Sequence, residues 1–234
     1  MAKKIVEETD LLESPLHGNQ GDRQPTTPLH APLGTTIAIS REAGSRGGSI
    51  ARRVGKRLGW QIYTQELLEY IHANETARAH VLADIPEEAA SWADNHLETL
   101  RSEKIIDPQL DLGEMPRLVL TLAARGNIVI LGRGGGFLLP RSSTLHVRIV
   151  APFEDRVAYL ANWLRLTHEE AIRQVHDRDL KRADYLSQFI KSDPGDMCHY
   201  DLVLNSFQLG EETCADLIVN ASQGKDRFQL ANVE

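Results

Sequence analysis

The stretch that decides the fold is "TTIAISREAGSRGGSIARRVGKRLG", Thr35 to Gly59. It begins with a short apolar run rich in β-branched residues, which is typical of a buried strand. A glycine-rich turn follows, and Ile50, Val54 and Leu58 then recur at four-residue spacing, which indicates an amphipathic helix that ends at Gly59. This order favours an anion site, because the N–H groups of such a turn converge at the positive end of the helix.

The turn departs from the standard phosphate loop G-x-x-x-x-G-K-[ST], because Gly47 stands at the position of the lysine. Taken alone, it is equally compatible with a phosphate site and with a structural turn. Gly44, Gly47 and Gly48 permit close backbone approach to a ligand. Ser49 either binds Mg²⁺ through its hydroxyl or caps the helix.

Composition points to one α/β domain, because 234 residues with 41% hydrophobic content can bury a sizeable core. A net charge of −7 argues against broad nucleic-acid binding. Cys198 and Cys214 are too few for a disulfide framework, so we expect reduced thiols and a cytoplasmic protein. No apolar run approaches 18 residues, and the N-terminus does not read as a secretory signal, so we expect no membrane span.

Strand-like and helical segments alternate along the chain. Residues 1–34 hold four of the ten prolines and are predicted to form a disordered or loosely docked tail. Residues 74–111 are polar and helical in tendency, with one helix expected to start at Pro86 and another over 91–106. The order indicates a parallel sheet covered on both faces, with strands predicted over 35–40, 60–63, 127–132, 144–151 and 200–205.

The opening "ISREAGSRGGSIARRVGKRLGWQIY" resembles the start of the cytidylate kinase-like family, through its Ser-Arg-Glu, its glycine turn, the Leu-Gly that ends its helix and its Tyr63. Four later segments match in order: "VILGRGGGFLL", "LHVRIVAPFEDRVAYL", "RDLKRADYLSQF" and "YDLVLNSFQLGEETCADLIV". The resemblance covers about residues 35–221. Three positions depart from the pattern: Arg46 replaces a glycine, Gly48 an arginine and Thr64 an aspartate.

The resemblance implies a P-loop-type parallel α/β sheet flanked by helices on both faces. The domain would span 35–222, with a helical nucleotide-binding insertion at about 64–115, a mobile lid at about 156–192 and a C-terminal tail at 223–234. The implied reaction moves the γ-phosphoryl group of ATP, with Mg²⁺, to a nucleoside monophosphate such as CMP or dCMP. The alternative is a nucleotide-binding sensor or partner-binding protein with weak or no turnover, because the turn is atypical.

Such a transfer needs several cations around the phosphoryl oxygens, and arginine binds two oxygens at once. Tyr159 stands where the family has a second arginine, and either stacks on a base or packs as a surface tyrosine. No nucleic-acid or membrane partner is expected. The need for a cation at the phosphates suggests a catalytic role and an ATP contact for Arg46, although the family has a glycine there. The resemblance implies catalytic roles for Arg178 and Arg182, ATP contacts for Gly44, Ser45, Gly47, Gly48, Ser49 and Arg156, substrate contacts for Arg41, Tyr63, Gly132, Arg133 and Asp179, and Mg²⁺ ligation by Ser49.

Overall fold

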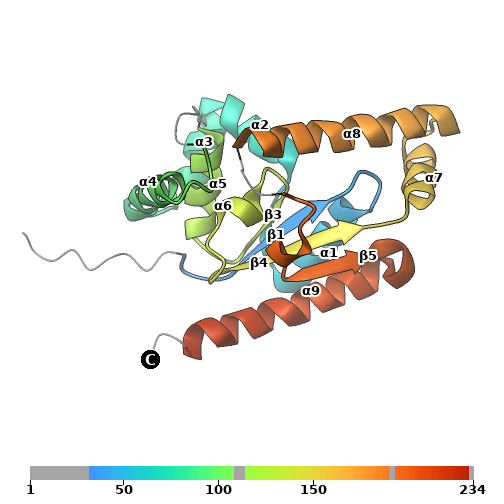
Figure 1. The fold of residues 1–234 in the computed structure, drawn as a ribbon. Coiled ribbons are helices and arrows are strands. Elements are labelled where there is room, and N and C mark those ends of the chain that lie inside the picture. Colours follow the sequence, from blue (N-terminus) through green and yellow to red (C-terminus); the bar gives the residue numbers. More distant parts are fainter. Residues whose placement is uncertain (1–31, 108–113, 190–192, 232–234) are drawn as a thin grey trace, which may run out of the picture.

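A five-stranded parallel sheet forms the centre of the computed structural model, which describes residues 32–107, 114–189 and 193–231 (Figure 1). Strand β1 (Thr36–Arg41) lies in the middle, between β3 (Ile128–Leu131) and β4 (Thr144–Val150). Strand β2 (Gln61–Tyr63) lies beyond β3, and β5 (Leu202–Asn205) lies beyond β4. The predicted parallel α/β sheet is therefore confirmed.

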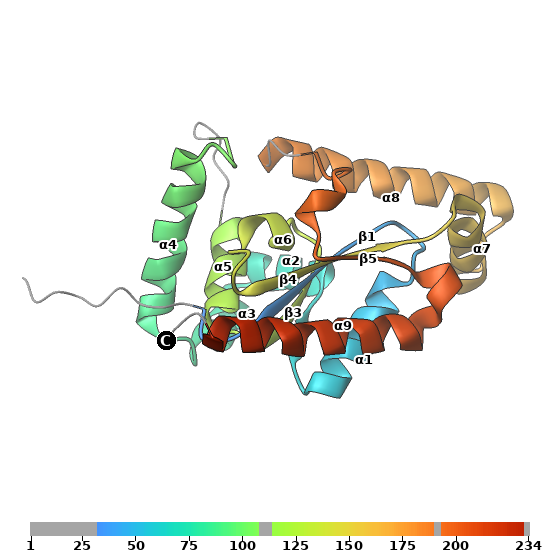
Figure 2. The same cartoon turned by 60° about the horizontal axis from the view of Figure 1, so that its bottom comes forward.

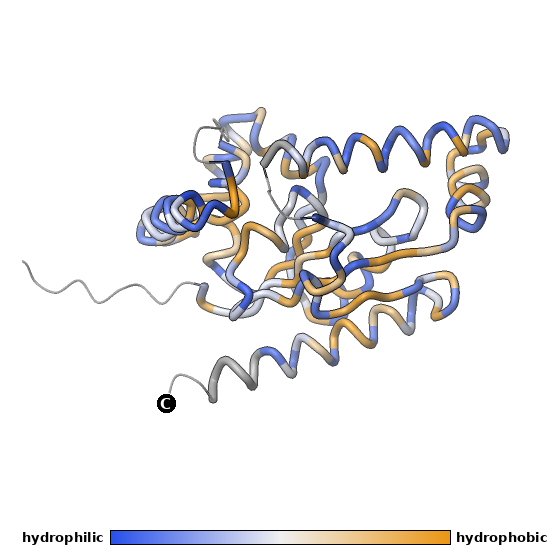
Figure 3. The backbone as a smooth tube through the Cα atoms, viewed as in Figure 1, coloured by the Kyte–Doolittle hydropathy of each residue, from blue (hydrophilic) through white to orange (hydrophobic). Residues whose placement is uncertain are grey.

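Helices cover both faces of the sheet, because its strands are apolar on both sides. Helices α1 (Gly47–Leu58) and α9 (Ser206–Ala231) cover one face, where Val54 and Ile218 pack with Ile37. Helices α5 (Met115–Ala124) and α6 (Gly135–Leu138) cover the other (Figure 2). The hydrophobic residues accordingly concentrate along the strands and the helices next to them (Figure 3).

Three helices fill the region of the predicted insertion: α2 (Gln65–Ala73), α3 (Glu75–Leu82) and α4 (Glu87–Ser102). The Thr64 side chain accepts a hydrogen bond from the N–H of Leu67 and so acts as the N-cap of α2. The expectation of two helices after Pro86 is wrong. Pro86 is the N-cap of a single helix, because Ala93, Leu97 and neighbouring apolar residues of α4 bury one continuous face against α5.

Helices α7 (Phe153–Leu164) and α8 (His168–Phe189) lie beyond the carboxyl ends of the strands, in the region of the predicted lid. Thr167 and Glu170 form a capping box at the start of α8. A separate apolar cluster, which includes Ala43, Val157 and Val175, joins both helices to the turn after β1. Residues 223–231, predicted as part of a tail, continue α9, whereas residues 1–31 lie outside the described residues.

The chain changes direction at β1. It first runs to β2 and β3 on one side, and then crosses to β4 and β5 on the other, with the short 3₁₀ helix η1 (Met197–His199) before β5. Ligands of open parallel sheets bind beyond the carboxyl ends of the strands at such a switch point. Among the described helices, none is long and apolar enough to cross a membrane.

Candidate active site

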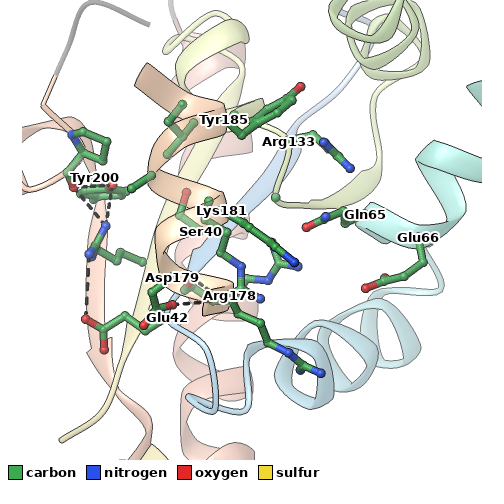
Figure 4. A pocket seen from close by; sticks show the side chains of 18 residues that line it. Ser40, Glu42, Gln65, Glu66, Arg133, Arg178, Asp179, Lys181, Tyr185 and Tyr200 are labelled. Atoms are coloured by element: carbon green, nitrogen blue, oxygen red, sulfur yellow. Dashed lines mark hydrogen bonds and ion pairs between the residues drawn. The ribbon is translucent and has the colours of Figure 1, made fainter. Parts of the chain in front are cut away.

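A cavity of about 670 Å³ opens at the carboxyl end of β1, between the start of α2, the loop after β3 and the face of α8 (Figure 4). Positive side chains predominate in its lining, which favours an anionic ligand. Six lining side chains are cationic, namely Arg41, Arg133, Arg148, Arg178, Lys181 and Arg182, and three are acidic, namely Glu42, Glu66 and Asp179.

Arg41, the last residue of β1, is the most strongly perturbed of these cations. Its side chain runs past the backbone of Gly47 and Gly132, and a Cβ on Gly47 would lie 2.7 Å from the Cβ of Arg41. Burial and the positive charge of Arg182 lower the pKa of Arg41 from its ordinary value to about 10. Arg133 lowers it further, and only Glu66 opposes the shift. A bound anion would relieve this repulsion.

Arg133 brings the loop after β3 into contact with two helices. It adopts a left-handed conformation (φ 54°), which directs its side chain into the cavity, and it forms an ion pair with Glu69 of α2. Its guanidinium also lies 4.7 Å from the ring centroid of Tyr185 on α8. Gly132, which precedes Arg133, lines the cavity as well. Both residues of the predicted Gly-Arg pair are thus at the site.

Asp179 joins α8 to the glycine turn. Its carboxylate accepts a hydrogen bond from the N–H of Ala43 at 2.7 Å and another from Nη1 of Arg156 at 2.6 Å. Arg156 also donates to the carbonyl oxygen of Ala43 at 3.1 Å, while Arg182 lies 3.3 Å from the same carboxylate. Asp179 and Arg156, predicted to contact substrate and ATP, therefore hold the turn and the α8 arginine in position.

The glycine turn has a defined backbone. Gly44 has a φ of +81°, and Arg46 occupies the N-cap of α1 in the left-handed conformation, with no side-chain capping bond. Ser45 is fully buried, and its hydroxyl donates to the carbonyl oxygen of Glu42 at 2.9 Å. Its own carbonyl accepts from Ser206 at 2.8 Å. Ser45 therefore supports the turn, with its hydroxyl directed into the protein.

Ser49 lies inside the first turn of α1, so the alternative that it caps the helix is wrong: Arg46 holds that position. The Ser49 hydroxyl donates to a carboxylate oxygen of Glu211 on α9 at 2.5 Å. Hydroxyl and carboxylate oxygens are ligand types that suit Mg²⁺, so this pair fits the implied cation, which would replace Arg53 at 3.2 Å from the same Glu211 oxygen. Among the residues that the structure describes, no group of three or more His, Cys, Asp or Glu side chains could hold a metal.

Two predicted residues point away from the cavity. The Arg46 guanidinium lies 5.2 Å from the ring centroid of Tyr159 on α7. Tyr63 is only 6% exposed and belongs to the apolar cluster under α5, where burial raises the pKa of its hydroxyl. Tyr63 is therefore not a lining residue, because the short strand β2 places its side chain in the core.

A family model described as the cytidylate kinase-like family matches residues 36–208. The chain belongs to the cytidylate kinase-like family. A cytidylate kinase from Ignicoccus hospitalis is 26% identical over 184 residues, which are 79% of this chain and 96% of that protein. A cytidylate kinase from Methanopyrus kandleri is 25% identical, over 77% of this chain and 89% of that protein. These relatives support a kinase of the nucleoside monophosphate kinase type.

One solved structure supports the fold. An uncharacterized protein from Eubacterium ventriosum superposes with a TM-score of 0.62, at 17% identity, over 81% of this chain and 98% of its own. At this identity the likeness concerns the fold, and the function has to be argued from the site.

Two residues of the site, one in the cavity and one beside the glycine turn, were not singled out from the sequence. Arg148 on β4 donates to the Tyr200 hydroxyl at 3.0 Å and lies 4.0 Å from Glu42. An arginine inside the apolar run "LHVRIV" is the signal that could have found it, because a strand rarely buries a charge without a partner. Glu211 gave no such signal, because it lies among other acids at the start of a long helix.

Proposed function

We propose that the protein transfers the γ-phosphoryl group of ATP to a nucleoside monophosphate, with CMP or dCMP as acceptor. The observation that carries the proposal is Arg41. Its guanidinium is largely buried at the wall of the cavity and close to Arg133 and Arg182, and within the described residues no carboxylate reaches ion-pair distance of it. A buried cation without a partner is unfavourable, so an anionic phosphate is the natural complement.

Arg41 also separates two regions that suit two substrates. On one side lies the cavity, which would take the monophosphate with Arg133 at its phosphate. On the other side lies the glycine turn, where the backbone N–H groups at the start of α1 would bind the ATP phosphates. Because Arg41 packs against both Gly47 and Gly132, it would lie near the phosphoryl group during transfer.

In the proposed reaction, an oxygen of the acceptor phosphate attacks the γ-phosphorus, the bond to the bridging β-oxygen breaks, and ADP leaves. This chemistry depends on positioning and charge neutralisation more than on a strong base. Arg178, Lys181 and Arg182 of α8 would surround the transferred group from the cavity side. Mg²⁺, held by Ser49 and Glu211, would neutralise charge on the ATP phosphates.

The second candidate is a nucleotide-binding protein with weak or no turnover. Two observations favour it: Gly47 stands where a phosphate loop carries its lysine, and Arg46, the nearest cation of the turn, lies on Tyr159. Both candidate functions predict nucleotide binding, and only the first predicts turnover.

An ADP-release assay with CMP, dCMP, UMP and AMP as acceptors separates them. We expect turnover with CMP or dCMP, and a loss of kcat/KM of about 100-fold in Arg133→Ala, as for removal of one transition-state donor. Arg173→Ala is the matched control, because Arg173 is an exposed arginine of α8 outside the cavity lining. Absence of ADP formation with all four acceptors, with ATP binding intact, would establish the second candidate.

A further inference from the structure

Two aromatic residues of α7, the half-buried Tyr159 and the exposed Trp163, stack beside the glycine turn. The ring centroids of Tyr159 and Trp163 lie 6.2 Å apart, and their planes differ by 13°. Their spacing of four residues places both on one face of α7. Trp163 is 66% exposed, although a side chain of this size normally loses most of its surface on folding. An accessible flat aromatic surface is typical of a binding site.

Arg46 connects this aromatic pair to the turn. Its backbone is the N-cap of α1, and its guanidinium lies over the ring of Tyr159 at 5.2 Å from the centroid. The aromatic surface therefore begins one side chain away from the N–H groups that would hold phosphate. Glu211 also interacts electrostatically with Tyr159, so the ring lies close to the pair proposed to hold Mg²⁺.

A nucleotide has the same layout: a charged phosphate chain joined through a sugar to a flat, aromatic base. We propose that the Tyr159–Trp163 pair is the stacking surface for the nucleobase of the triphosphate donor, and that it accepts purines and pyrimidines alike. The inference rests on the proposed function, which assigns the donor to the glycine turn. We expect this surface to bind different bases with similar affinity, because stacking uses the π-face that every base has and does not depend on the hydrogen-bonding edge of the base.

The position of Arg46 adds a second consequence. In the free protein its guanidinium covers Tyr159, which is the same surface that the base would occupy. A base that stacks on Tyr159 displaces the guanidinium, and the side chain, which is anchored at the turn, then reaches the phosphates of the same ligand. Base binding would thereby deliver a cation to a turn that lacks the usual lysine.

Binding measurements test the platform independently of turnover. Calorimetric titrations would compare ADP, GDP, CDP and inorganic tripolyphosphate on the full-length protein with Mg²⁺. For Trp163→Ala we expect ADP to bind about tenfold more weakly, as for loss of one base-stacking ring, and tripolyphosphate to bind as in the unchanged protein. Tyr159→Phe keeps the ring and should bind ADP normally. Tyr70→Ala is the matched control, because Tyr70 is an aromatic residue that is 58% exposed on a different helix, α2.

In the unchanged protein, affinities for ADP, GDP and CDP should agree within about tenfold, and a wider spread would refute the proposed tolerance. Unchanged ADP affinity in Trp163→Ala would refute the platform and assign the exposed tryptophan to another role, such as contact with a partner protein. An equal loss of tripolyphosphate binding would also refute it. If ADP binding depends on Trp163 but no acceptor is phosphorylated, the proposed transfer fails and the platform stands.

Discussion

Replacing Arg41 with methionine removes the most strongly perturbed charge of the cavity. Burial and the nearby arginines lower its pKa from its ordinary value to about 10, which corresponds to about 3 kcal/mol at 1.36 kcal/mol per pKa unit. At neutral pH the guanidinium is charged in the folded and the unfolded state, and the folded state holds its proton less tightly. The charge therefore destabilises the folded protein at every pH below about 10.

Without ligand, Arg41→Met should thus be more stable than the unchanged protein, by at most about 3 kcal/mol, because methionine keeps part of the packing. For a chain of this length a gain of about 3 kcal/mol corresponds to a rise in Tm of about 6–12 °C. The same variant should lose the stabilisation that CMP confers, because the phosphate loses its central cation. Thermal unfolding with and without CMP measures both effects.

Arg178→Met is the control for this experiment, because it removes a positive charge from the same cavity at a residue of α8. We expect its stability without ligand to stay close to that of the unchanged protein. If Arg41→Met unfolds at a lower temperature and still responds to CMP, the assignment of Arg41 as an unsatisfied phosphate ligand is refuted.

Three further predictions follow from single contacts. Burial lowers the pKa of His146 from 6.5 to about 4, so the neutral imidazole contributes about 3 kcal/mol to the free energy of unfolding above pH 6.5. This contribution is lost as the pH falls from 6.5 through 4. Acid unfolding should show the resulting decrease in stability with falling pH, and His146→Gln should lack it. Asp179→Asn should loosen the contact between α8 and the turn, seen as faster amide exchange in α8 and at least a tenfold lower kcat/KM; unchanged exchange would contradict it. Gly44→Ala should destabilise by more than about 3 kcal/mol in urea unfolding, because its Cβ would collide with the Arg156 carbonyl, whereas Gly59→Ala, also at positive φ but in open space, should lose only about 1 kcal/mol.

Local patterns were enough to predict the layers of this fold. The strand, glycine turn and helix from Thr36 to Leu58 appear as predicted, as does the helix stop at Gly59. The alternation of apolar, strand-like runs with helical segments correctly indicated a parallel sheet with helices on both faces. These features depend on neighbouring residues and on backbone preferences, which a sequence displays directly.

The contacts that side chains make at the site could be predicted less well from local sequence patterns than the layers of the fold. Tyr63 fits the family pattern, yet the short strand β2 turns its ring into the core. Arg46 was expected at the phosphates, and the structure places its guanidinium on Tyr159. A motif identifies which residue types stand near a turn, but the direction of each long side chain depends on the helices that pack around it.

By itself, the sequence determined the element order, the glycine turn and the set of cations that the family reaction would need. Only the tertiary structure decided which side chains of the site lie in contact with one another. Asp179 reaches the N–H of Ala43, and Ser49 reaches Glu211, across separations of 136 and 162 residues. Such pairings depend on how α8 and α9 pack against the sheet, and no local periodicity records that packing, because it arises from burial of apolar faces far apart in the chain.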